Sequence, residues 1–282
     1  MSSEIEETRI SIPTEEPRGR CDNIIYDRIL SFRYSIRSYL AEFFGTLIFV
    51  FFGTGSVAAV TFQPDLRPVG WLLISFGFGF GIAMGIYVSI GISGGHVNPA
   101  VTIASAIFRK FPIFHVPFYI LSQLLGGICG AALTYFIYMQ KFTPYDGGTR
   151  KTTGTKSTAG IFATYPDSEN TNIVSFFTEV ILTTVFLFCI QGFVNTKIPQ
   201  TTSYTPLAVG LLILVISISF GTMTGFSLNP ARDLGPRLFT LMAGWGTNPF
   251  TAFSYYFWIP VVGPILGAIL GIFLYDCFII PT

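Results

Sequence analysis

The sequence predicts an all-α integral membrane protein with six transmembrane helices, two re-entrant half-helices and an inverted internal repeat. Three observations predict this fold class. The 282 residues are 51% hydrophobic and only 11% charged, whereas soluble domains carry roughly 25% charged residues. The apolar residues are grouped in long runs without charge, and the two halves of the chain resemble each other. The net charge of +1 gives no sign of a nucleic-acid partner.

Charge-free runs locate the membrane spans, because a charged side chain at the bilayer centre costs at least a few kcal/mol. About 20 apolar residues are enough to cross the bilayer as a helix. The runs cover residues 43–62, 68–108, 111–140, 173–194, 198–231 and 238–275. The run 68–108 is too long for one helix and too short for two helices and a loop. Six full helices and two segments of about half a span therefore fit the sequence.

The segments outside the runs divide the chain. Residues 1–37 begin with a polar, mixed-charge stretch that has no apolar core, so we expect a disordered cytoplasmic tail rather than a signal peptide. The first repeat is expected over 38–140, a polar connecting loop over 141–172 and the second repeat over 173–279. The four cysteines lie far apart and show no metal-site spacing, so neither a disulfide framework, a metal nor a cofactor is expected.

The internal repeat is visible in two pairs of segments. "AEFFGTLIFVFFGTG" (41–55) resembles "TEVILTTVFLFCIQG" (178–192), which aligns Glu42 with Glu179. "SGGHVNPAV" (93–101) resembles "TGFSLNPAR" (224–232), which aligns Asn98 with Asn229. The two offsets differ only by a short insertion or deletion. Three spans per repeat is an odd number, so the second repeat enters the membrane upside down relative to the first.

The distribution of positive charges favours a cytoplasmic N-terminus. This orientation places seven Lys and Arg residues inside, namely Arg20, Arg28, Arg33, Arg37, Arg109, Lys110 and Lys197. It leaves five outside, namely Arg67, Lys141, Arg150, Lys151 and Lys156. Cytoplasmic loops carry the excess of positive charge in membrane proteins, so seven against five favours this orientation weakly.

Each Asn-Pro-Ala triplet reads as the start of a short helix. Proline suits the first turn of a helix, and asparagine is a strong N-cap. The triplets Asn98, Pro99, Ala100 and Asn229, Pro230, Ala231 therefore predict half-helices over 101–108 and 232–243. Two inverted copies bring the positive ends of two helix dipoles together near the midplane. The alternative, a chance surface turn, does not account for two triplets in register within an inverted repeat.

These paired motifs and the repeat resemble the aquaporin (major intrinsic protein) family over about residues 38–278. The "NPARDLGPR" form is similar to the aquaglyceroporin branch, whose pattern Asp233, Arg237, Pro260 and Val261 fit. The resemblance implies six helices and two half-helices around one pore per subunit, in a homotetramer. No nucleophile–base pair is present, so the chain is not expected to be an enzyme.

The resemblance also implies a selectivity filter. By position relative to the two asparagines, it comprises Phe78, Ser217, Phe226 and Arg232. The carbon chain of a polyol can lie on the two rings while its hydroxyl groups accept hydrogen bonds from the guanidinium, a rigid and always charged donor. A serine in place of the histidine of water channels implies a wider filter. For a phenylalanine taken at random, core packing or lipid contact is the common role, so position alone singles out these two.

Other roles follow from the same resemblance. A ladder of carbonyl acceptors is implied at Gly94, Gly95, His96, Phe226 and Ser227, with the Asn98 and Asn229 amides donating at the centre. Glu42 and Glu179 are expected to accept N–H bonds from the loops, although a proton relay is the alternative. Asp233 is expected to brace Arg237 or the helix start rather than to contact the permeant. His96 is expected to be a buried anchor rather than a titrating gate.

The sequence thus predicts a passive channel for glycerol, water and other small neutral solutes that excludes protons and ions, in the plasma membrane. A water-selective channel is the near alternative, against which Phe226 and Ser217 argue. A coupled transporter and a junctional membrane protein with a vestigial pore are the alternatives from other classes.

Overall fold

The computed structural model describes residues 20–194 and 204–280, apart from the side chains of 20–25, and these residues form helices and connections without a strand. The α-helices are α1 (Arg20–Phe62), α2 (Gly70–Ser93), α3 (Pro99–Phe108), α4 (Val116–Asp146), α5 (Asn172–Val194), α6 (Thr205–Phe220), α7 (Pro230–Thr240), α8 (Asn248–Tyr255) and α9 (Ile259–Phe278). Within the described residues, 6 helical segments are long and apolar enough to cross a membrane. Helices α3 and α7 have only 10 and 11 residues. The expected fold class is therefore confirmed.

The N-terminal part differs from the expectation in one respect. Helix α1 begins at Arg20, so residues 20–37, which the sequence analysis assigned to a disordered tail, are helical. Residues 1–19 of that tail, and Lys197, lie outside the described residues. Residues from Ser38 onward form a compact unit of their own, and the following description refers to that unit.

The two repeats meet through equivalent residues of α2 and α6. A Cβ atom added to Gly79 would lie 2.8 Å from the carbonyl oxygen of Gly210, and one added to Gly210 would lie 2.5 Å from that of Gly79. The separation of these two glycines along the chain equals that of Asn98 and Asn229. A reciprocal contact of this kind is what a pseudo-two-fold axis between inverted repeats produces, and small residues allow the close approach of the helix backbones.

The outer helix pairs obey the same symmetry. Gly126 of α4 packs against the carbonyl of Phe43 in α1, and Gly267 of α9 packs against the carbonyl of Val180 in α5. Phe43 and Val180 directly follow the two aligned glutamates, so they are equivalent positions of the repeat. The glycines that recur every fourth residue in α4 (Gly126 and Gly130) and in α9 (Gly263, Gly267 and Gly271) therefore lie on helix-packing faces.

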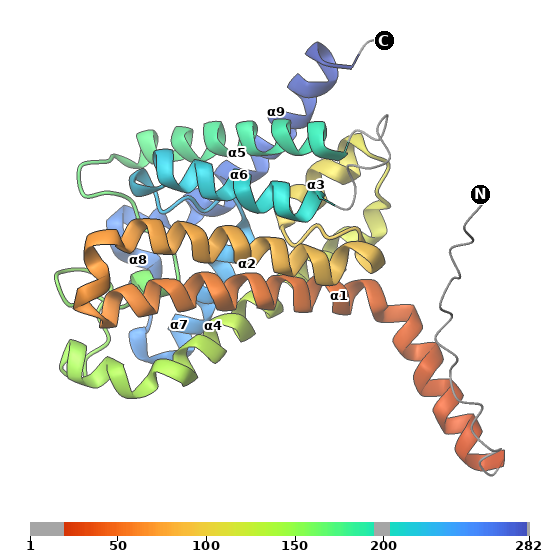
Figure 1. Ribbon diagram of the computed structural model, residues 1–282, viewed down its shortest axis with the longest axis horizontal. Helices are drawn as coiled ribbons and strands as arrows, with labels where there is room; N and C mark the ends of the chain where they lie inside the picture. Colours follow the sequence, from red (N-terminus) through yellow and green to blue (C-terminus); the bar gives the residue numbers. More distant parts are fainter. Residues whose placement is uncertain (1–19, 195–203, 281–282) are drawn as a thin grey trace, which may run out of the picture. The chain divides into compact units, whose positions relative to one another are not determined.

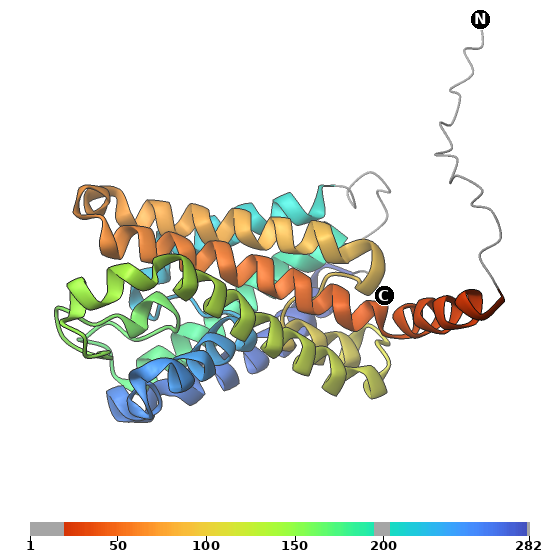
Figure 2. The ribbon, with the colours of Figure 1, turned by 90° about the horizontal axis from the view of Figure 1, so that it is seen from below.

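The two half-helices each pack against the last helix of the opposite repeat. Helix α3 contacts α9, and α7 contacts α4. In Figure 1, α2, α5 and α6 run alongside one another, with α3 toward one end of these helices and α7 toward the other. Figure 2 shows the same helices from a direction turned by 90°. The starts of α3 and α7 thereby meet in the interior, where the candidate site lies.

Replacing Gly267 by alanine should destabilise the α5–α9 pair. The added methyl group would collide with the carbonyl of Val180 and lie 2.8 Å from Cβ of Thr183, and overpacking of this kind costs about 1–3 kcal/mol. A lower thermal unfolding midpoint of the purified protein in detergent would show it. Gly55→Ala is the matched control, since its added Cβ meets nothing within 4 Å; equal midpoints for both variants would contradict the packing role.

Candidate permeation site

Both half-helices begin at their Asn-Pro-Ala triplets, as the sequence predicts. The Asn98 side chain accepts a hydrogen bond from the N–H of Ala100 at 2.8 Å, and the Asn229 side chain accepts one from Ala231 at 2.9 Å. Pro99 and Pro230 are the first residues of α3 and α7, where a missing N–H leaves no bond unmade. Each asparagine therefore caps its own helix with its oxygen and keeps its nitrogen free for other partners.

Those nitrogens tie the two repeats together. Asn98 Nδ2 donates to the carbonyl of Leu228 at 2.9 Å, and Asn229 Nδ2 donates to the carbonyl of Val97 at 2.8 Å. An amide nitrogen carries two N–H groups, so each asparagine retains a second donor. Both asparagines line a cavity of about 230 Å³, which leaves this donor available to a molecule in the cavity.

The loops before the half-helices hold residues in a rare backbone conformation. Val97 and Leu228 have φ values of 49° and 54°, in the left-handed region that β-branched and bulky side chains seldom adopt. Conformations of this kind cost about 1–3 kcal/mol each and persist only where the surroundings enforce them. Their surroundings include a buried carboxylate in each repeat.

Glu42 and Glu179 provide these carboxylates, and both are fully buried. Each accepts two successive backbone N–H groups of its loop: His96 and Val97 at 2.9 and 2.6 Å for Glu42, and Ser227 and Leu228 at 2.9 and 3.0 Å for Glu179. Glu42 also accepts from Ser93 at 2.6 Å and from Gln123 at 2.7 Å. Neither glutamate is among the residues that line the cavity. This geometry favours the bracing role over the proton relay.

The carbonyl groups expected to face the pathway accept no hydrogen bond from the described part of the protein. Among the hydrogen bonds of the described loop residues, none ends on the carbonyl of Gly94, Gly95, His96, Phe226 or Ser227, and all five residues line the cavity. A buried carbonyl without a partner is costly, and Phe226 and Ser227 are buried. Water or a hydroxylated solute in the cavity can supply the missing donors.

The His96 ring is anchored on one side of this loop. Its Nδ1 lies 3.1 Å from the hydroxyl of Thr102, and the ring packs against Phe111 and Tyr119 with centroids 4.8 and 5.4 Å apart. These contacts fit the expected anchor better than a titrating gate.

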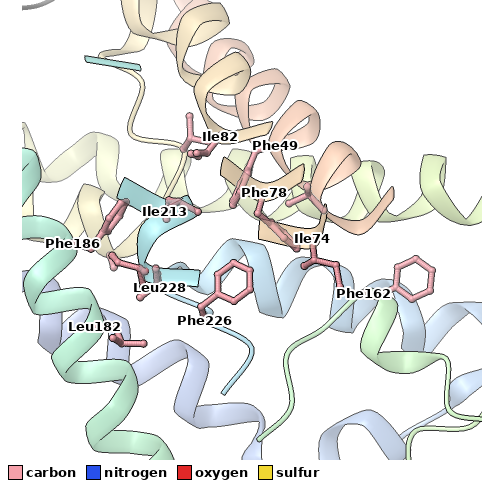
Figure 3. Close-up of a cluster of buried hydrophobic side chains, with 14 of the residues drawn as sticks. Phe49, Ile74, Phe78, Ile82, Phe162, Leu182, Phe186, Ile213, Phe226 and Leu228 are labelled. Atoms are coloured by element: carbon pink, nitrogen blue, oxygen red, sulfur yellow. The ribbon is translucent and has the colours of Figure 1, made fainter. Parts of the chain in front are cut away.

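The first cavity and a second one share two lining residues, and we call the region between the two cavities the constriction. The second cavity, of about 180 Å³, is lined by Trp71, Thr164 and Tyr165 among others, and it shares Phe226 and Arg232 with the first. Phe226 lies edge-on to Phe78 with centroids 5.3 Å apart. Figure 3 shows these two rings among the apolar side chains that line the first cavity, namely Phe49, Ile82, Phe186, Ile213 and Leu228.

Arg232 completes the constriction. Its Cζ lies 4.1 Å from the centroid of the Phe78 ring and 5.6 Å from that of Phe226, within the range of a cation–π contact. Its Nη1 donates to the carbonyl of Phe162 at 3.3 Å, while its Nε has no hydrogen-bond partner among the described residues. Three of the four filter residues expected from the sequence are thus brought together, and the Arg232 side chain lines both cavities.

Ser217 does not join them. It is fully buried and lines neither cavity, because its hydroxyl lies 2.7 Å from that of Ser75 and its carbonyl accepts from the indole of Trp71 at 2.8 Å. Trp71 in turn packs edge-on against Phe226 with centroids 5.8 Å apart. Direct contact of Ser217 with the pathway stays a prediction, and the structure links Ser217 to Phe226 through Trp71.

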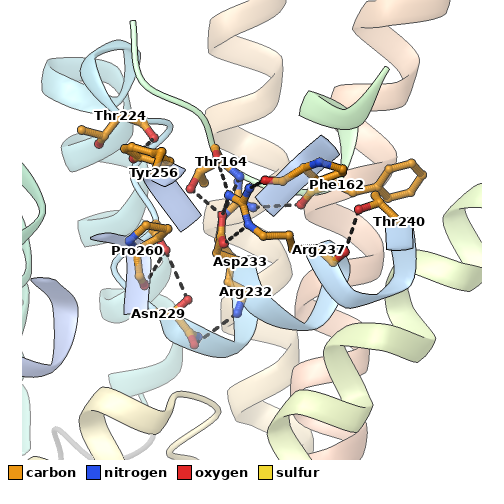
Figure 4. A network of polar contacts seen from close by, with 12 residues as sticks. Phe162, Thr164, Thr224, Asn229, Arg232, Asp233, Arg237, Thr240, Tyr256 and Pro260 are labelled. Atoms are coloured by element: carbon orange, nitrogen blue, oxygen red, sulfur yellow. Dashed lines mark hydrogen bonds and ion pairs between the residues drawn. The ribbon is translucent and has the colours of Figure 1, made fainter. Parts of the chain in front are cut away.

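Behind Arg232, a buried ion pair joins α7 to the connecting loop. Asp233 receives Arg237 Nε at 2.8 Å on one oxygen, and the N–H and hydroxyl of Thr164 at 2.7 and 2.6 Å on the other. Arg237 also donates to the Thr164 carbonyl at 2.7 Å, as Figure 4 shows. Burial raises the pKa of the neighbouring Tyr165 phenol above its ordinary value. This arrangement fits the bracing role expected for Asp233 and Arg237.

Sequence reasoning missed several residues of the site. Gln123 offers a signal in retrospect, because a buried amide within an apolar span needs a partner. Arg109 lines the far end of the first cavity, where it donates to Gln191 at 2.9 Å and pairs with Asp276 at 2.6 Å. The contributions of Phe162 and Thr164 come from a loop, and no sequence pattern marks them.

Comparisons with known proteins agree on one family. The profile described as major intrinsic protein matches residues 30–275. Aquaglyceroporin-2 of Rhizophagus irregularis is 44% identical over 245 residues, which cover 86% of this chain and 77% of that protein. Aquaglyceroporin-3 of Trypanosoma brucei brucei is 41% identical over 247 residues, covering 88% and 80%. The X-ray structure of the aquaglyceroporin from Plasmodium falciparum superposes with a TM-score of 0.78 at 33% identity, covering 87% of this chain and 97% of that one.

Replacing Glu42 by glutamine should loosen the first loop. A glutamine replaces one carboxylate oxygen with an NH₂ group, so at least one loop N–H would lie opposite another donor instead of an acceptor. Each buried donor left unpaired costs about 1–3 kcal/mol. We expect a lower thermal unfolding midpoint and lower water permeability in proteoliposomes. Glu169→Gln makes the same change at an exposed position and should leave both unchanged; a Glu42→Gln protein that matches this control would refute the bracing role.

Removing the Asp233 carboxylate should be far more costly than removing an exposed one. Asp233→Ala leaves the fully buried Arg237 without its counter-charge, which costs about 3–5 kcal/mol. Asp276→Ala, at an ion pair whose side chains are 34% and 30% exposed, should cost at most about 1 kcal/mol. Thermal unfolding of the two variants makes the comparison. Equal destabilisation would show that burial of the pair is not what stabilises α7, whereas Asp233→Leu/Arg237→Leu should be milder than Asp233→Ala.

Proposed function

Because this chain belongs to the major intrinsic protein family, we propose that its two cavities form a passive transmembrane channel for glycerol and water. The two relatives and the solved structure described above carry the name aquaglyceroporin, in agreement with the branch that the sequence resembles. The chain is an integral, multi-pass membrane protein with the aquaporin fold. Other small neutral solutes are further candidates for the same route.

The observation that carries this proposal is the composition of the constriction. The aromatic rings of Phe78 and Phe226 and the guanidinium of Arg232 lie against one another beside the route, and the guanidinium carries the hydrogen-bond donors of the constriction. A polyol has an apolar carbon chain and a row of hydroxyl groups, so it matches such a surface on both counts. A narrower, more hydrophilic constriction would suit water alone.

The first cavity then conducts the solute past the two half-helices. Unpaired carbonyls of the two loops accept hydrogen bonds from its hydroxyl groups, and the second N–H of Asn98 and of Asn229 donates to its oxygen atoms. The positive ends of two half-helix dipoles lie at this point, and Arg232 adds a full charge. Positive charge of this kind repels protons and other cations, which supports the exclusion of ions.

Coupling to a proton gradient has less support. Glu42 and Glu179 are buried carboxylates within membrane-spanning helices, and backbone N–H groups occupy both. A relay needs carboxyl groups that face the route and exchange protons with it. The channel therefore needs no energy source and follows the solute gradient in either direction.

Assembly and location complete the proposal. We infer a homotetramer in the plasma membrane with a cytoplasmic N-terminus. Large apolar side chains exposed along the outer faces of the helices, such as Phe52, Phe80, Leu211 and Phe273, suit contact with lipid or with neighbouring subunits. The excess of positive charge on the N-terminal side supports the orientation.

Stopped-flow light scattering on proteoliposomes tests the function. Vesicles with the channel should shrink in a sucrose gradient faster than empty vesicles, and in a glycerol gradient they should shrink and then re-swell. Arg232→Ala should let protons leak after an acid pulse, because the charge that repels them is gone. Fast shrinkage without glycerol re-swelling would identify a water-selective channel, and glycerol uptake that depends on a pH gradient would identify a coupled transporter.

A further inference from the structure

Two glycines lie directly behind the rings of the constriction. A Cβ atom added to Gly53 of α1 would overlap the Phe78 ring, with Cζ at 2.7 Å and two further ring carbons closer still. A Cβ atom added to Gly221, just after α6, would lie 2.6 Å from Cδ1 of Phe226 and 2.8 Å from Cζ2 of Trp71. Carbon atoms in ordinary contact are about 3.5–4.0 Å apart, so neither ring could keep its place beside an alanine.

These glycines differ from those that pack helices. At Gly85, Gly126, Gly267 and Gly271 the first obstacle to a side chain is the backbone carbonyl of a neighbouring helix. At Gly53 all three nearest atoms belong to the Phe78 side chain. The backbone at Gly53 and Gly221 is in the ordinary range of φ, so neither position needs glycine for its conformation. Gly53 leaves space for the Phe78 ring, and Gly221 leaves space for the Phe226 ring.

The direction of the effect follows from which residues face the route. Phe78 lines the first cavity and Phe226 lines both, whereas Gly53 and Gly221 line neither. A methyl group at either glycine therefore pushes its ring from behind. Phe226 and Arg232 both lie against the Phe78 ring, so a Phe78 ring displaced from Gly53 changes the space that these three residues leave for a solute.

The second repeat supports this assignment. The alignment of the two glutamates makes Ile190 the equivalent of Gly53, and the alignment of the two asparagines makes Val209 the equivalent of Phe78. Both Ile190 and Val209 line the first cavity. The second repeat thus has two side chains of medium size where the first repeat has a glycine and a phenylalanine. The glycine is thus present in the repeat that carries the ring and absent from the repeat that does not.

We propose that Gly53 and Gly221 are specificity-determining residues, which set the width of the constriction by providing the space in which the Phe78 and Phe226 rings lie. This inference rests on the proposed glycerol and water channel. Glycerol needs more width than water, so each glycine governs the ratio of the two permeabilities rather than the opening of the channel as a whole.

The test compares water and glycerol permeabilities of the full-length protein in proteoliposomes, normalised to the amount of protein incorporated. Gly53→Ala and Gly221→Ala should each lower the glycerol-to-water ratio by about tenfold, which corresponds to about 1.4 kcal/mol in the glycerol barrier. Gly55→Ala and Gly91→Ala are matched controls, because a Cβ atom at either position meets nothing within 4 Å, and both should keep the ratio of the wild type.

A second-site change separates the proposed mechanism from a folding defect. Phe78→Leu removes the ring that the new methyl group displaces, so Gly53→Ala/Phe78→Leu should recover most of the glycerol flux that Gly53→Ala loses. An unchanged ratio in Gly53→Ala, or an equal loss of both permeabilities that Phe78→Leu does not restore, would overturn the inference. Absence of glycerol flux in the wild type would instead overturn the proposed function. The water permeabilities of the glycine variants would then still show whether the rings had been displaced.

Discussion

The lack of hydrogen-bonding partners in lipid is the constraint on which this structure depends. Two loops interrupt the helices at membrane depth, and their backbone groups have to be satisfied by protein or by molecules in a cavity. Buried carboxylates accept the N–H groups, and two asparagine amides donate to the carbonyls of Val97 and Leu228. Five loop carbonyls have no partner among the described residues, and they belong to residues that line the first cavity. A route for hydroxylated solutes is therefore the way in which this fold satisfies its own backbone.

The position of the Arg232 side chain depends on residues that lie farther from the cavities. Arg232 is oriented by the Phe162 carbonyl, which belongs to a loop that Asp233 and Arg237 fasten to α7. The Phe162 ring is buried against Phe142 and Trp245, with centroids 6.1 and 5.5 Å apart. Arg232 is thus connected to a larger aromatic and ionic assembly, most of whose members, such as Asp233, Arg237 and Phe162, line neither cavity.

Much of this could be predicted from the sequence, and the exceptions have physical reasons. The spans and half-helices follow from charge-free runs and from Asn-Pro caps, which are local signals. Phe78, Phe226 and Arg232 could be located because each lies at a fixed distance from an asparagine. The same rule predicts Ser217 at the filter, whereas its hydrogen bonds with Ser75 and Trp71 join distant segments and leave no local signal. The helical residues 20–37 were missed because their mixed charge resembles that of a disordered segment.

The inverted repeat finally explains why the residues of the expected filter do not occur in two symmetrical copies. A perfect repeat would give a symmetrical pore, yet equivalent positions carry different side chains. Gly95 and Phe226 stand at equivalent positions before the two asparagines, and Val101 and Arg232 stand at equivalent positions after them. The repeat symmetry places equivalent backbone positions on both sides of the midplane. Only the second repeat carries Phe226 and Arg232 at these positions, so the expected filter lies in one half. Selectivity could therefore be tuned through these few positions without disturbing the hydrogen bonds that hold the two halves together.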